Sequence, residues 1–171
     1  MDRNLLHTVS TTALMPALGL LPQFMRSEAA VAFLLAVGLQ ESRLTYRRQT
    51  LNGPARGLWQ FERGTEASRG GVWGVYLHKA SREHLRRLCL SRQVPFLPEA
   101  IYAQLEHDDI LAAGVARLLL WTDAAPLPDR SDAEAAWKLY ALRTWRPGKP
   151  HRSTWNAYYA DAWSFVLLGD G

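Results

Sequence analysis

Apolar residues recur at intervals of three and four along most of this chain, which is the repeat of an α-helix. The most apolar stretch covers residues 28–41, and Ser27 before it can accept the free N–H groups of a first helical turn. Polar residues gather at its end, around Glu41, and residues 45–57 are basic and contain Asn-Gly-Pro. The pattern predicts a buried helix that opens into a loop after Glu41.

The same period predicts further helices downstream. They are expected over residues 81–94, 100–105, 109–121 and 131–146, and from about residue 153 to residue 168. The sequence Ser131-Asp132-Ala133-Glu134 is typical of a capping box, with Ser131 as the cap. Residues 70–74 are rich in glycine and predict a turn, and residues 125–130, with two prolines, predict a linker. With no alternating pattern of useful length and no internal repeat, the sequence predicts a mainly α fold with little or no β structure.

The length of 171 residues suits one globular domain, and 48% hydrophobic residues provide a core while excluding a disordered or collagen-like polymer. We expect residues 1–26 to form a helical extension packed on this domain. The apolar tract over residues 13–25 contains two prolines and is shorter than the roughly 20 residues that span a bilayer. The sequence therefore predicts no stable membrane insertion, and we expect a monomer.

The single Cys89 excludes an intramolecular disulfide and a cysteine zinc cluster. His78, His84 and His107 lack the spacing of metal ligands, so we expect neither a metal nor another cofactor. Asp2 and an adjacent arginine leave no positively charged leader. These features predict a protein made in the cytoplasm without a signal peptide or membrane anchor.

Glu41 is the first residue that could carry chemistry. A carboxyl group between an apolar helix and a polar loop can have its pKa raised by burial above the usual value of about 4.3. Such a group stays protonated near neutral pH and can act as a general acid. The alternative is a Glu at a helix end that pairs with Arg43, Arg47 or Arg48.

The segment Gly57-Leu58-Trp59-Gln60-Phe61 is the second feature with chemical potential. Gly57 would let a ligand or a helix approach closely, Gln60 offers a donor and an acceptor, and Trp59 offers a face for a sugar. These properties suit a carbohydrate cleft. The alternative is a core turn in which Trp59 and Phe61 are buried.

Taken in order, the two segments Ala36-Val37-Gly38-Leu39-Gln40-Glu41-Ser42 and Gly57-Leu58-Trp59-Gln60 resemble motifs of the lysozyme-like superfamily. The similarity is to its soluble lytic transglycosylase and phage muramidase branch, in which a helix ending in Glu-Ser is followed by Gly-Leu-Met-Gln. Trp59 stands in place of that Met. The resemblance covers about residues 27–150.

A later stretch extends this resemblance. Residues 135–141 are similar to the Ala-Tyr-Asn segment of the family, with Tyr140 in place of its tyrosine and Ala141 in place of its asparagine. Residues 140–150 look like the equivalent stretch of phage-encoded members. The resemblance thus implies a phage-encoded enzyme that reaches the cell wall after release from the host or as part of a virion.

The activity that the resemblance implies is cleavage of the β-1,4 bond between N-acetylmuramic acid and N-acetylglucosamine in peptidoglycan glycan strands. Glu41 would be the general acid and base, and Gln60, Tyr140 and Trp59 would orient the sugar. Ser42 and Gly57, within the matching motifs, would also belong to the substrate-binding site.

Two reaction types remain open for such an enzyme. A hydrolysing lysozyme would pair Glu41 with a second carboxylate, whereas a lytic transglycosylase would use groups of the substrate and release 1,6-anhydro products. The possible second carboxylates are Glu62, Glu66, Asp108 and Asp109. None lies in a recognisable pattern, which favours the transglycosylase.

The chain has seven Trp and six Tyr, and aromatic faces bind sugars well. Trp73 and Trp145 could be sugar platforms beside Trp59. The remaining tryptophans of interest lie on apolar helical stripes and are expected in the core. They are Trp137, Trp155 and Trp163.

The formal net charge of +4 favours approach to an anionic surface such as the bacterial envelope. It also leaves a non-enzymatic alternative, because Arg82, Arg86, Arg87 and Arg92 would form a basic helical face that could contact nucleic acid. No nucleic-acid-binding motif accompanies this face, so we expect no nucleic acid as a partner. Arg146 and Lys149, in the predicted loop near residue 147, could meet acidic peptide stems or be solvated.

Overall fold

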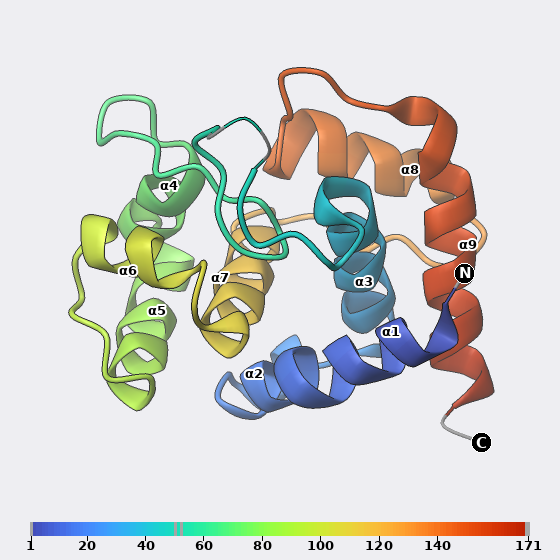
Figure 1. The fold of residues 1–171 in the computed structure, drawn as a ribbon, viewed down its shortest axis with the longest axis horizontal. Helices are drawn as coiled ribbons and strands as arrows, with labels where there is room; N and C mark the ends of the chain where they lie inside the picture. Colours follow the sequence, from blue (N-terminus) through green and yellow to red (C-terminus); the bar gives the residue numbers. More distant parts are fainter. Residues whose placement is uncertain (1, 50, 52, 170–171) are drawn as a thin grey trace.

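Helices make up most of the computed structural model, which describes residues 2–49, 51 and 53–169 (Figure 1). The α-helices are α1 (Arg3–Val9), α2 (Met15–Gly19), α3 (Glu28–Ser42), α4 (Gly71–Leu77), α5 (Lys79–Ser91), α6 (Pro98–Gln104), α7 (Asp109–Trp121), α8 (Ala133–Lys138) and α9 (Arg152–Leu168). The described residues also include two π-helical segments, η1 (Ser10–Leu14) and η4 (Leu139–Thr144), and the 3₁₀ segment η2 (Gln23–Met25). The predicted mainly α fold class is confirmed.

Extended pairing is limited, within the described residues, to two isolated antiparallel bridges in the segment between α3 and α4. Arg56 pairs with Arg48 in one bridge and with Phe61 in the other. The backbone N–H of Arg56 donates to the Phe61 carbonyl (2.9 Å), and the Phe61 N–H donates back (2.8 Å). These bridges fold the segment into a short hairpin-like turn over the end of α3.

Helix α3 is the central element, and it is buried on nearly every side (Figure 1). The predicted cap is present, because the Ser27 hydroxyl oxygen accepts the Ala30 N–H (3.1 Å). α3 packs chiefly along α9 and also contacts α7 and η1. A helix that is apolar all round is stable only in such a position, so its sequence accounts for its central place.

Helix α3 ends abruptly after Ser42. Arg43 adopts a left-handed conformation (φ 56°), and the Leu44 N–H folds back to donate to the Gly38 carbonyl (3.1 Å). The Leu44 side chain is buried over Gly38, and a Cβ at residue 38 would collide with it. The absence of a side chain at Gly38 therefore permits this turn, which leaves Glu41 in the last turn of the helix.

The N-terminal segment belongs to the same apolar core as the rest of the chain. Leu6, Leu14, Leu18 and Met25 are almost completely buried, and η1 and α2 pack on α7. In Figure 1 this segment lies along the lower side of the molecule, beneath α3. Residues 2–26 thus bury side chains against the remainder of the chain.

Residues 70–74 do not form the predicted glycine turn, because helix α4 begins within them. The chain instead becomes helical at Gly71, and Val72 and Val75 are fully buried against the core. Burial of these two apolar side chains on one helical face outweighs the low helix propensity of the glycines.

The caps of two later helices also differ from expectation. α5 begins at Lys79 instead of residue 81, because the imidazole of His78 accepts the Ala80 N–H (3.2 Å). At α8 the cap is Asp132, whose carboxylate accepts the Ala135 N–H (2.8 Å), and Ser131 donates to Asp129 instead. Of the two adjacent aspartates that could start α7, Asp108 and Asp109, the cap is Asp108, whose carboxylate accepts the Leu111 N–H (2.9 Å).

Helix α8 continues directly into the π-helical segment η4, which contains Tyr140. The Thr144 hydroxyl donates to the Leu139 carbonyl five residues earlier (2.6 Å) and follows the wider turn. A π-helical segment rotates the side chains after it relative to a regular helix, and such segments are frequent at functional sites.

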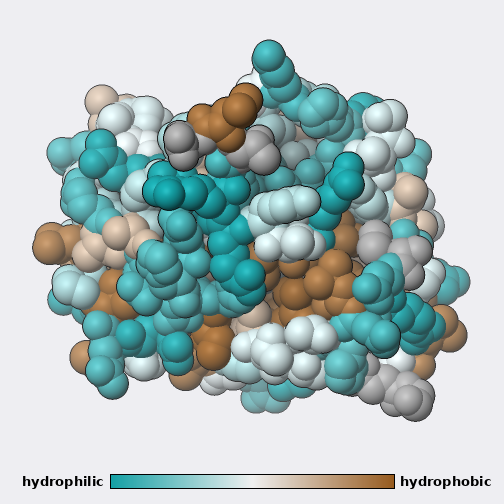
Figure 2. Space-filling view, in the orientation of Figure 1, coloured by the Kyte–Doolittle hydropathy of each residue, from teal (hydrophilic) through white to brown (hydrophobic). Residues whose placement is uncertain are grey.

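Hydrophilic side chains dominate the face seen in Figure 2, with apolar side chains gathered near its centre. Across the described residues we find no helix with the length and apolar character that crossing a membrane requires.

Candidate active site

Glu41 lies partly buried in the last turn of α3, and its carboxylate Oε1 accepts a hydrogen bond from the Tyr140 hydroxyl (2.8 Å). Burial raises the pKa of Glu41 from 4.5 to about 7; the Tyr140 hydrogen bond opposes this rise, and the negative charge of Glu62 adds to it. Near neutral pH the carboxyl group is therefore protonated in a large fraction of the molecules.

The ion pair that the sequence allowed as the alternative for Glu41 is not formed. Arg47 instead pairs with Asp109 (2.8 Å), and Arg48 lies 3.5 Å from Glu106. Arg43 is exposed after the end of α3, and no ion pair with Glu41 is present among the described residues. Without such a pair, the Tyr140 hydrogen bond offsets only part of the cost of ionising Glu41 in its partly dry environment.

Tyr140 is held by stacking. Its ring lies nearly parallel to that of Trp155, with 4.9 Å between the ring centroids and 6° between the planes, and the residue is only 2% exposed. Burial and the neighbouring Glu41 raise the pKa of the hydroxyl above its usual value, so it remains a donor. Its hydroxyl contacts Glu41 and can position that carboxyl group, whereas the role of Tyr140 in orienting the sugar stays a prediction.

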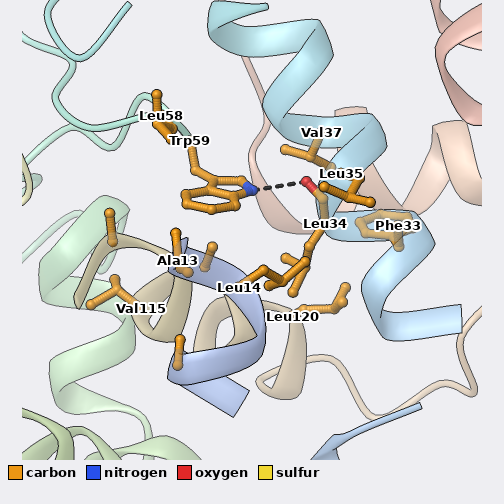
Figure 3. Packing of buried hydrophobic residues seen from close by; sticks show 14 of the residues in the cluster. Ala13, Leu14, Phe33, Leu34, Leu35, Val37, Leu58, Trp59, Val115 and Leu120 are labelled. Carbon is orange, nitrogen blue, oxygen red and sulfur yellow. Dashed lines mark hydrogen bonds between the residues drawn. The ribbon is translucent and has the colours of Figure 1, made fainter. Parts of the chain in front are cut away.

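The prediction that Trp59 orients the sugar is wrong. Its side chain is completely buried, and its indole N–H donates to the Leu34 carbonyl (2.8 Å), surrounded by apolar side chains (Figure 3). Its face is therefore covered by the core and cannot serve as a sugar platform. The alternative of a core turn is confirmed for this residue and for Phe61, which is also buried.

Ser42 and Gly57 are also corrected from substrate contacts to structural residues. The buried Ser42 hydroxyl donates to the Leu58 carbonyl (2.6 Å) and so joins the end of α3 to the following turn. Gly57 is buried with φ +74°, and a Cβ there would lie 2.8 Å from the Leu105 carbonyl oxygen. Because Gly57 has no side chain, the backbone at Leu105 can approach it closely.

Gln60 is the one member of this motif that is partly exposed at the surface. Its amide nitrogen donates to the carbonyls of Gly57 (2.9 Å) and Tyr46 (3.2 Å). Both N–H bonds of the amide are thereby engaged, which leaves the amide oxygen as the group that can meet a substrate. Its role in substrate binding stays a prediction.

Trp145 follows η4 and is partly exposed beside the same site. Its indole N–H donates to the Trp59 carbonyl (3.0 Å), and its ring centroid lies 6.4 Å from that of Tyr140. The structure thus keeps Trp145 available as an aromatic wall near Glu41. Trp73 packs edge-on against Tyr76 (5.6 Å between ring centroids), away from these contacts. The expected core positions of Trp155 and Trp163 are confirmed, whereas Trp137 is partly buried and packs against the core.

The four possible second carboxylates differ in their surroundings. Asp108 caps α7 and pairs with Arg92 (2.8 Å), and Asp109 is taken by Arg47. Glu66 is exposed. Glu62 is exposed as well, but its charge raises the pKa of Glu41, and no pattern in the sequence marked it out from the other three.

The predicted basic face of α5 is largely engaged within the protein. Arg82 stacks on Tyr76 (4.2 Å to the ring centroid), and Arg86 and Arg87 both lie within 3.6 Å of Glu83. Arg92 pairs with Asp108, whereas Arg86 and Arg87 share the single charge of Glu83 and their side chains stay more than half exposed. Among the described residues no group of His, Cys, Asp or Glu side chains could hold a metal ion.

No protein-family model, no curated protein and no solved structure matches this chain. The functional argument therefore depends on the geometry around Glu41.

Proposed function

We propose that this protein cleaves the β-1,4 glycosidic bond between N-acetylmuramic acid and N-acetylglucosamine in peptidoglycan, with Glu41 as the general acid and base. The single observation that carries the proposal is the partly buried carboxyl group of Glu41, whose pKa is raised to about 7 and which has no cationic partner in the part of the chain that the structure describes. The resemblance of the Glu41-Ser42 and Gly57–Gln60 segments to lytic transglycosylases supplies the substrate class.

The hydrogen bond from Tyr140 assigns different tasks to the two oxygens of Glu41. Oε1 accepts from the Tyr140 hydroxyl, so the acidic proton resides on Oε2 and can be donated to the glycosidic oxygen as the bond breaks. General acid help of this kind is worth roughly 10²–10⁴ in rate. The ionised Glu41 then takes the proton of the incoming hydroxyl group.

In the transglycosylase reaction that incoming hydroxyl is the 6-hydroxyl of the muramoyl sugar, and the product is a 1,6-anhydro end. The exposed position of Glu62 and the ion pairs of Asp108 and Asp109 favour this reaction, because an exposed or ion-paired carboxylate is poorly suited to act as a nucleophile. Hydrolysis with Glu62 as the second carboxylate is the alternative, favoured by its influence on the pKa of Glu41.

Purified cell walls provide the direct test. Glu41→Gln keeps the shape of the side chain and the acceptor for Tyr140 but has no acidic proton, so we expect release of soluble wall fragments to fall at least about 10²-fold. Glu66→Gln, which changes an exposed carboxylate outside the described contacts of Glu41, is the matched control and should retain activity. Full activity of Glu41→Gln would exclude the proposal.

Mass spectrometry of the released fragments separates the two reactions. Transglycosylation gives anhydro ends, and a Glu62→Gln variant should then keep activity within a few-fold of wild type. Hydrolysis gives reducing ends, and loss of the Glu62 carboxylate should then abolish it.

A further inference from the structure

Arg117, in the middle of α7, has a buried positive charge that the proposed activity does not use. The residue is 3% exposed. Its Nε donates to the Met25 carbonyl (2.7 Å), whereas Nη1 is buried without a hydrogen-bond partner. A guanidinium group has five N–H bonds to satisfy, and no carboxylate pairs with it in the described part of the chain.

This arrangement is costly for the folded protein. Burial lowers the pKa of Arg117 to about 10, so the group still carries its charge at neutral pH. The ring of Trp121, 5.4 Å from the guanidinium carbon, offsets only part of the lost hydration. Buried charges are normally paired, and one left unpaired destabilises the fold unless a further partner is bound.

Arg117 also lines a surface cavity of about 790 Å³, a size typical of small-molecule sites. The segment after α7, which runs behind α3 in Figure 1, provides one wall, and the starts of α3 and α5 provide others. Phe24 is 65% exposed at this cavity and packs on Trp121 with 5.3 Å between the ring centroids. The remaining apolar lining includes Leu120, Pro126 and Leu127.

The other ionisable groups of the lining already have partners. Asp123 pairs with Arg143 and accepts the Ala125 N–H (2.9 Å). His78 accepts the Ala80 N–H at the beginning of α5 (3.2 Å). The cavity thus combines aromatic and aliphatic walls with one uncompensated positive charge.

We propose that this cavity binds a small amphipathic carboxylate. The carboxylate would accept a hydrogen bond from the Arg117 guanidinium group, which lines the cavity and has no acidic partner among the described residues, and the apolar body would lie against Phe24 and Trp121. No residue of the Glu41 site lines the cavity, so the two sites can be tested separately.

Two probes of equal size and opposite charge test the proposal: 2-naphthoate and 2-naphthylmethylammonium. Calorimetric titration of the full-length protein should give naphthoate an affinity at least tenfold above that of the ammonium compound. Arg117→Met should remove this preference, because the positive charge that faces the carboxylate is gone. Arg86→Met, at an exposed arginine of α5 outside the cavity, is the matched control and should keep the preference.

Phe24→Ala provides a second test if Arg117→Met does not fold. Because Phe24 is largely exposed, its substitution should weaken the binding of both probes without unfolding the protein. Equal affinities of the two probes for wild type would overturn the proposal. It would also be overturned by naphthoate binding that is unaffected in Arg117→Met, or in Phe24→Ala. Wall cleavage in each variant should stay at the wild-type rate.

Discussion

At the scale of single residues, two buried polar groups set the chemistry of the proposed site. Glu41 is poorly hydrated, and the hydroxyl of Tyr140 donates to it. The hydrogen bond stabilises the ionised carboxylate, whereas burial and Glu62 stabilise the protonated form. The balance of these effects places the pKa of Glu41 at about 7, where a carboxyl group can both give and take a proton.

The raised pKa of Glu41 predicts a pH-dependent cost for stability. The pKa is about 7 in the folded protein and near 4.5 in the unfolded chain, so between these pH values the native state binds more protons. The free energy of unfolding should therefore fall as pH rises from about 4.5 to about 7 and stay level above that. Glu41→Gln cannot ionise, and we expect it to be more stable than wild type at pH 8 by about 1–3 kcal/mol.

Urea unfolding of both proteins at pH 4 and at pH 8 measures this difference. The two proteins should have nearly equal stability at pH 4, where Glu41 is protonated in both states. A difference that is the same at both pH values would contradict the raised pKa.

Tyr140→Phe tests the positioning role of the hydroxyl. Loss of the donor removes the contact that lowers the pKa of Glu41, so this pKa should rise further. We expect the alkaline limb of the pH–activity profile to move up by about one pH unit, since a hydrogen bond to a charged group is worth about 1.5–3 kcal/mol. Tyr158→Phe, at a tyrosine of α9 with no described contact to Glu41, should leave the limb in place. A purely structural role for Tyr140 would lower stability without moving the limb.

At the scale of elements, the site forms where α3, the turn that follows it and η4 pack together. Ser42 and Trp59 attach the turn to α3, and the indole of Trp145 attaches it to the chain after η4. These hydrogen bonds connect three segments distant in sequence. The contact between Glu41 and Tyr140 lies where these three segments meet.

Trp59→Phe distinguishes a core role from sugar binding. The variant loses the hydrogen bond to the Leu34 carbonyl and leaves a void in a fully buried position. We expect the free energy of unfolding to decrease by about 2–4 kcal/mol. Wall cleavage by the folded variant should stay near the wild-type rate, with unchanged substrate affinity. A drop in affinity with little change in urea unfolding would restore Trp59 as a sugar platform.

At the scale of the whole molecule, the N-terminal segment contributes to the core that supports α3 and α7. Leu14 and Met25 are completely buried, and the Met25 carbonyl accepts from Arg117. Each fully buried side chain of this kind stabilises by about 1.5–3 kcal/mol, so several together match the net stability of a domain, about 5–15 kcal/mol.

Removal of residues 2–26 is therefore expected to abolish cooperative folding. Near-ultraviolet circular dichroism and size-exclusion chromatography should reveal lost tertiary packing and aggregation. Within the segment, Leu14→Ala should cost about 2–5 kcal/mol, whereas Leu20→Ala, at a leucine that is 42% exposed, should change stability little. A truncated chain that unfolds cooperatively would show that the segment is dispensable.

The sequence by itself determined the features that depend on neighbouring residues. The apolar repeat and the Ser27 cap defined α3, and the end of the repeat located Glu41 at a helix terminus next to a loop. The start of α7 was narrowed to Asp108 or Asp109, and the structure selects Asp108. These elements follow from periodicity and capping. Both involve residues that are close in sequence, so both can be recognised from the sequence alone.

Only the tertiary structure decided what surrounds these residues. Glu41 and Tyr140 are 99 positions apart in the chain, and their hydrogen bond depends on the π-helical turn of η4. Trp59 faces the core because the Leu34 carbonyl accepts its indole N–H, and the same tryptophan in an isolated turn could equally face a ligand. A side chain's direction, hydration and pKa depend on contacts with segments that are distant in sequence. The order of neighbouring residues does not specify those contacts.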